Sequence, residues 1–267
     1  MKSKFTCAAL LLALTAPAIS AYAQFEKVPS FVKQIEIGYG YSFCTADYII
    51  KSKGELPTRP VDTTITTHTH TKGGITETFG TSLRLKRLGM KSTLSLGIDL
   101  LYSGYIWDFH TPSNVVLNDT GFRYYYDNDL PVFDGATFTA GGAITADFKF
   151  GAEAMMDKHY RWCWTIGAGV FPSVSATAAT GLDANIGFGI QPIVKGEVGL
   201  RGPIVAKLRL QYSFGNITYL DYTTPSDQLI AGSGQQTQII GTSNFTISLL
   251  LMPMSWMYKK STWYNSY

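Results

Sequence analysis

Apolar and polar residues alternate strictly along the segment that follows Phe31. The apolar residues occupy every second position: Ile35, Ile37, Tyr39, Tyr41 and Phe43. Between them stand Glu36, Gly38, Gly40 and Ser42. Successive side chains of a β-strand point to opposite faces, so this alternation predicts a strand with one apolar face and one polar, glycine-rich face.

The same alternation recurs along the chain and predicts eight strands in all. We place them at 31–44, 76–88, 93–107, 137–151, 160–171, 185–200, 204–214 and 239–252. Short turns follow the second, fourth and sixth strands, and long connections follow the first, third, fifth and seventh, at 45–75, 108–136, 172–184 and 215–238. Ten strands are the alternative, because the alternating threonines of 63–71 could form an extra hairpin. We interpret that segment as part of the first connection, which could also extend the first two strands.

The arrangement of these strands indicates a membrane protein. An even number of strands, one apolar and one polar face on each, and alternating short and long connections are typical of a transmembrane barrel. Aromatic residues gather near both ends of the predicted strands, as expected at the two interfaces of a membrane. The sequence therefore predicts an all-β fold, a transmembrane antiparallel up-and-down β-barrel of eight strands, with long extracellular loops and short periplasmic turns.

Residues 1–23 have the three parts of a secretory signal peptide. Lys2 and Lys4 provide the charged start, 8–14 the apolar core, and Ala21-Tyr22-Ala23 a small-residue cleavage site. The mature chain would span 24–267, with a short tail at 253–267. Without the two lysines, the 22 basic residues become 20, against 19 acidic ones. Because no basic run is interleaved with aromatic residues, the sequence gives no indication of a nucleic-acid partner.

The chain resembles the small eight-stranded outer-membrane barrels, the superfamily of OmpA membrane domains, OmpX-type adhesins and lipid A-modifying barrels. The resemblance covers roughly residues 31–252. It rests on the architecture and on pieces such as Ile37-Gly-Tyr-Gly-Tyr-Ser-Phe43 and Ile166-Gly-Ala-Gly-Val170. It implies a location in the bacterial outer membrane, with membrane lipids and the barrel-assembly machinery as partners. One departure is the tail, since residues 259–267 follow Trp256 and Tyr258, which could supply the family's terminal aromatic residue.

Charged residues fall on the polar, inward faces of the predicted strands. We expect the following to form a polar network in the lumen: Glu36, Arg84, Asp99, Asp147, Lys195, Glu197, Lys207 and Arg209. The interior of an eight-stranded barrel is only wide enough for side chains to fill it, and buried charges must be matched. These considerations favour a filled, paired core over the alternative, a narrow ion path.

Two other groups of residues could carry chemistry. His68 and His70 would share one face of an extended segment, a spacing that can bind a transition metal, but no cysteine or carboxylate cluster surrounds them in the sequence. We therefore predict neither a metal site nor a cofactor. Tyr124, Tyr125 and Tyr126 make the second long connection aromatic, and they could contact a ligand or pack the loop on itself.

Sequence motifs of enzymes that share this architecture are absent or weak. The predicted function is therefore that of a non-enzymatic surface protein, with a structural, adhesive or binding role exercised through the long external loops. The alternative is a barrel that binds or modifies lipid, because Pro192 cannot donate to the ladder of the sixth strand and could mark a seam for lateral access. A narrow channel is the third possibility. Cys44 and Cys163 should lie at different heights on opposite walls, so we predict that both thiols are free.

Overall fold

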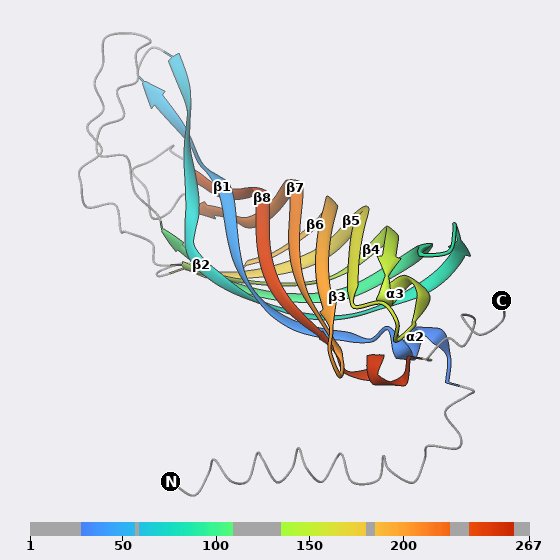
Figure 1. The fold of residues 1–267 in the computed structure, drawn as a ribbon. Helices are drawn as coiled ribbons and strands as arrows, with labels where there is room; N and C mark the ends of the chain where they lie inside the picture. Colours follow the sequence, from blue (N-terminus) through green and yellow to red (C-terminus); the bar gives the residue numbers. More distant parts are fainter. Residues whose placement is uncertain (1–27, 57–58, 109–134, 180–184, 225–234, 259–267) are drawn as a thin grey trace, which may run out of the picture.

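A computed structural model describes residues 28–56, 59–108, 135–179, 185–224 and 235–258. Eight antiparallel strands form a closed barrel in which each strand pairs with its neighbour in sequence and β1 pairs with β8 (Figure 1). The strands are β1 (Glu36–Leu56), β2 (Arg59–Arg87), β3 (Ser92–Asp108), β4 (Gly135–Gly151), β5 (Trp162–Ala179), β6 (Asn185–Arg201), β7 (Val205–Thr224) and β8 (Gln235–Met252). The predicted all-β fold, an antiparallel up-and-down barrel of eight strands, is confirmed. The signal peptide and the tail from residue 259 lie outside the described residues.

Apolar side chains cover the outside of the barrel, and polar ones line its inside. On β7, Leu208 and Leu210 are 51% and 47% exposed, whereas Arg209 between them is 1% exposed. The predicted alternation is thus confirmed on this strand, and the outward positions of β1 and β6 follow it too. A closed barrel leaves no unpaired edge, so such a wall can present its apolar face to lipid.

Several strands continue beyond the ends predicted from the sequence. The first connection, expected at 45–75, is a hairpin in which β1 and β2 stay paired out to Leu56 and Arg59. It projects beyond the rest of the barrel (Figure 1). The ten-strand alternative is wrong, because 63–71 lies within β2. Likewise, β5, β7 and β8 extend into the connections expected at 172–184 and 215–238. The prediction failed there because serine, threonine and alanine occupy these strand ends, so apolar and polar residues no longer alternate clearly, although inward positions such as Ser175 and Thr177 stay buried. Of the second connection, 109–134 lies outside the described residues.

The hydrogen-bonded pairing of β6 with β7 covers only part of the two strands. Their ladder runs only from Arg201–Val205 to Ile193–Ser213, so it stops where Pro192 begins. Beyond this point β7 approaches the inner face of β6, and a Cβ atom on Gly187 would overlap the carbonyl oxygen of Thr218. The Ser175 hydroxyl on β5 donates to that same carbonyl at 3.3 Å. The outer half of β7 therefore leans into the lumen.

Three short helical segments lie at the opposite end from the β1–β2 hairpin, which we call the short-turn end. They are α2 (Ser30–Lys33), α3 (Ala152–Met155) and the 3-10 helix η3 (Pro253–Met257). Ser30–Lys33 is thus helical, although it was predicted to begin the first strand. The Gln34 side-chain amide donates to the Glu153 carbonyl at 3.3 Å, and the Val205 amide donates to the Ser255 hydroxyl at 2.7 Å. No helix among the described residues is long and apolar enough to cross a membrane.

Candidate functional site

Most of the predicted lumen residues do lie inside the barrel. The buried ones are Glu36 on β1, Asp99 on β3, Asp147 on β4, Lys195 and Glu197 on β6, and Lys207 and Arg209 on β7. Arg84 is the exception. Its side chain is exposed and donates to the carbonyl of Ala154 in α3. The prediction that Arg84 belongs to the lumen network is therefore wrong, because Arg84 lies at the rim of the short-turn end, where the β2–β3 pairing is irregular between Arg84 and Lys86.

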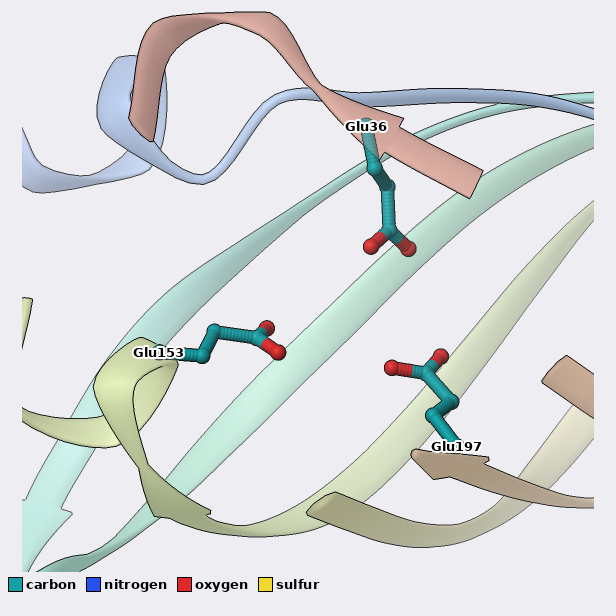
Figure 2. Close-up of side chains that lie close together, drawn as sticks. All are labelled: Glu36, Glu153 and Glu197. Atoms are coloured by element: carbon teal, nitrogen blue, oxygen red, sulfur yellow. The ribbon is translucent and has the colours of Figure 1, made fainter. Parts of the chain in front are cut away.

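Three glutamates surround the ammonium group of Lys207. Glu36, Glu153 and Glu197 come from β1, α3 and β6, and their carboxylates point toward one another (Figure 2). The Lys207 ammonium donates to them at 2.5 Å, 3.2 Å and 2.7 Å respectively. An ammonium group has three N–H donors, so all three are satisfied here.

The three-glutamate cradle is the kind of oxygen cluster that could hold a metal ion, since one ligand atom from each residue lies within 4.8 Å of the others. Lys207 already supplies a positive charge to all three carboxylates. Arg209 pairs with Glu36 and Glu197 as well. The cradle therefore fits a lysine ammonium, and the cation position that a metal would need is filled by the protein itself.

The remaining ion pairs cross the lumen. Lys195 on β6 approaches Asp99 on β3 at 2.8 Å and Asp147 on β4 at 3.2 Å. Arg209 on β7 reaches the same Asp99 carboxylate at 3.3 Å. Side chains from nonadjacent strands therefore meet in the interior. Burying these charges is tolerable because each has an oppositely charged partner.

Glu153 is the member of this network that sequence reasoning missed. It lies in α3, between β4 and β5, where no alternation marks a residue as inward. Its carboxylate pairs with Lys149 and Lys207, so the β4–β5 connection inserts a charge into the barrel from the short-turn end. The one available signal was the spacing of Lys149 and Glu153, four residues apart across the end of a predicted strand.

Apolar and aromatic side chains fill the interior toward the hairpin end. Trp107, Tyr105 and Tyr219 are buried there together with Ile217 and other residues of one cluster. The Trp107 indole N–H donates to the Thr137 hydroxyl at 2.7 Å. Cys44 belongs to this cluster, and Cys163 to a separate one at the short-turn end, so both thiols are buried and free. The interior thus contains apolar clusters toward both ends in addition to the ion-pair network.

A buried tyrosine, Tyr258, lies at the short-turn end. Tyr258, which follows η3, is 1% exposed and packs with Cys163, Val205 and Met252. Burial raises the pKa of its phenol well above the ordinary value, and the negative charge of Glu153 adds to the effect. Among the described residues its hydroxyl has no hydrogen-bond partner.

The other sequence candidates lie apart from this network. Tyr124, Tyr125 and Tyr126 fall outside the described residues. His68 and His70 lie on the β1–β2 hairpin, where the His68 ring nitrogen Nδ1 is 2.5 Å from Asp47 Oδ1. Pro192 is exposed on the outer wall, at the end of the β6–β7 ladder.

Comparisons with known proteins were made for sequence and for structure. No protein-family model and no curated protein matches the chain. Among solved structures, Neisserial surface protein A is similar at 10% identity and a TM-score of 0.35, covering 79% of this chain and 96% of its own. The Escherichia coli outer membrane protease OmpT matches at 9% identity and a TM-score of 0.36, covering 81% and 96%. The attachment invasion locus protein Ail of Yersinia pestis matches at 9% and 0.26, covering 78% and 97%.

Proposed function

We propose that this chain is a surface protein of the bacterial outer membrane, in which a sealed barrel anchors external segments that bind a partner. Membrane lipids would cover its apolar wall, and the barrel-assembly machinery would insert it. The observation that carries the proposal is the filled interior. Lys195 and Arg209 both reach Asp99 across the lumen, so the strands enclose paired side chains where a porin would hold water.

The β1–β2 hairpin is the external segment best suited to binding. It continues the ladder of the wall out to Leu56 and Arg59, so it is held by main-chain hydrogen bonds rather than by loop packing. A rigid element loses little conformational entropy when it binds, which favours affinity. This rigid display supports the proposal of an adhesive or binding role.

The experiment compares three bacterial strains. One produces the full chain, one produces a chain whose hairpin is shortened between Tyr48 and Thr67, and one produces neither protein. Fractionation and heat-modifiable gel mobility first establish that both proteins are folded in the outer membrane. Adherence to epithelial monolayers should fall to the level of the empty strain when the hairpin is shortened. Equal adherence of the two folded proteins would overturn the binding role of the hairpin. Sustained porin-sized conductance of the full chain in planar bilayers would overturn the sealed anchor.

A lipid-binding barrel is the second candidate, favoured by the early end of the β6–β7 ladder at Ile193 and Ser213. An acyl chain entering beside Pro192 would have to displace Ile217 and Tyr219 from the interior. Photoactivatable phospholipid offers a test, because labelling can be mapped to individual residues. Labels on Ile217 or Tyr219 would support lateral entry. Labels confined to outward residues such as Ile190 would reject it.

A further inference from the structure

The outer surface of the β1–β2 hairpin carries two histidines on one face. His68 and His70 are two residues apart on β2, and both are exposed. The register pairs His68 with Asp47 and His70 with Thr45 of β1. On the other side of β2, the partner of His70 is Asp108 of β3. Acidic residues that are distant in the sequence therefore take up cross-strand positions beside both histidines.

The contact between Asp47 and His68 determines which ring nitrogen is available. Asp47 Oδ1 lies 2.5 Å from His68 Nδ1, so the carboxylate accepts the proton carried on Nδ1. In a neutral imidazole the other nitrogen, Nε2, then has a free lone pair. The His68 side chain is 90% exposed, which leaves that nitrogen accessible from solvent. A carboxylate that fixes the tautomer and orientation of a histidine is the usual support of a metal-bound imidazole.

We propose that His68 and His70 form a binding site for a divalent transition metal ion such as Zn²⁺, with Asp47 as a positioning residue. Alternate residues of a strand lie about 6.6 Å apart along its axis, so two imidazoles on one face can turn toward a common ion. Imidazole nitrogen suits zinc, copper and nickel, and water completes the coordination in an open site. The three-glutamate cradle inside the barrel is not open to a metal ion in this way, because the Lys207 ammonium occupies it.

The sequence alone did not predict this site because no cluster of cysteines or carboxylates surrounds the two histidines along the chain. Asp47 is 21 residues from His68, and only the extended pairing of β1 with β2 brings them together. The alternative is a purely structural role, in which the Asp47–His68 contact only stabilises the pairing of β1 with β2 in the hairpin. That interpretation gives His70 no role, whereas a metal site requires both rings.

Calorimetric titration with ZnCl₂ tests the site on the untagged full chain folded in detergent micelles at pH 7.5. The parent should bind Zn²⁺ with a stoichiometry near one. His68→Ala and His70→Ala should each weaken binding at least tenfold, and the double variant should abolish it. His159→Ala is the matched control, because His159 lies in the β4–β5 connection at the opposite end of the barrel, and this variant should bind as the parent does. All three side chains, His68, His70 and His159, are exposed, and heat-modifiable mobility verifies folding.

Variants of Asp47 test its positioning role separately, through their affinity for Zn²⁺. Asp47→Asn should weaken Zn²⁺ binding by about tenfold, the lower end of effects seen when such supporting carboxylates are lost. Asp47→Glu should restore much of it. A parent that binds no Zn²⁺, or a double histidine variant that binds it unchanged, would overturn the site. Undiminished binding by Asp47→Asn would overturn the positioning role.

Discussion

The ammonium of Lys195 on β6 lies 2.8 Å from the carboxylate of Asp99 on β3, three strands away around the barrel. Two groups so far apart on the wall can touch only if their side chains span the lumen. Asp147 on β4 approaches the same ammonium at 3.2 Å, so one lysine pairs with carboxylates from two different strands. This relationship makes Lys195 central to both the sealing and the stability of the barrel.

Replacing Lys195 by methionine should destabilise the folded barrel by about 3–5 kcal/mol, because it removes the ammonium that pairs with the buried Asp147 carboxylate and one of the two cations beside Asp99. Urea unfolding in lipid vesicles, followed by tryptophan fluorescence, measures the loss. Lys86→Met is the matched control, since Lys86 is exposed at the rim and its removal should change the free energy of unfolding by less than about 0.5 kcal/mol. Similar values for the two variants would contradict an energetic role for the cross-lumen pair.

Leu208→Arg should cost roughly 2–4 kcal/mol if the position lies near the bilayer midplane, because the side chain faces lipid. Leu208 is 51% exposed, while its neighbour Arg209 is buried in the ion network. Leu85→Arg serves as the control, since Leu85 is outward too but near the end of β2, where an arginine should cost only about 0–1 kcal/mol. Should Leu208→Arg fold as well as Leu85→Arg, the proposed membrane position of the barrel would be wrong.

Gly187 and Gly196 on β6 offer a matched pair for testing the inward lean of β7. A Cβ atom at Gly187 would overlap the Thr218 carbonyl oxygen, whereas one at Gly196 would meet no atom within 4 Å. Gly187→Ala should therefore lower the free energy of unfolding or push the outer part of β7 away from β6. Gly196→Ala should be tolerated. Equal stability of the two variants, with unchanged protection of the β7 amides from hydrogen exchange, would refute the close approach.

The alternation of apolar residues was enough to predict the strand number, the inward face and the identity of most buried charges. It failed at both ends of the strands, for different reasons. In the hairpin from Thr45 to His70, threonines take the place of apolar residues, so the apolar period disappears although the two strands stay paired. At the short-turn end, Arg84 was predicted to face the lumen but is exposed at the rim.

Which charges pair with which could not be predicted from periodicity. The period fixes only the face of the wall on which a side chain lies, and partners such as Lys195 and Asp99 depend on strand tilt and stagger around a closed barrel. Glu153 has no strand period at all, and it enters the network because α3 folds back over the end of the barrel. The contact of Asp47 with His68 similarly depends on a hairpin register that the threonine-rich sequence leaves weakly specified.

The last prediction concerns Tyr258, whose buried phenol has a pKa raised well above its ordinary value. In the unfolded chain a tyrosine titrates near pH 10, so the folded state holds its proton more tightly than the unfolded state does. The stabilisation from this difference is complete below about pH 10 and is lost as the pH rises toward the folded pKa. Tyr258→Phe has no proton to lose, so it should lose less stability than the parent between pH 8 and pH 11. At pH 7 it should be neutral or slightly stabilising, because the hydroxyl has no hydrogen-bond partner among the described residues. Urea unfolding at the two pH values measures the difference. An alkaline loss in Tyr258→Phe as large as in the parent would show that this phenol is not buried at the short-turn end.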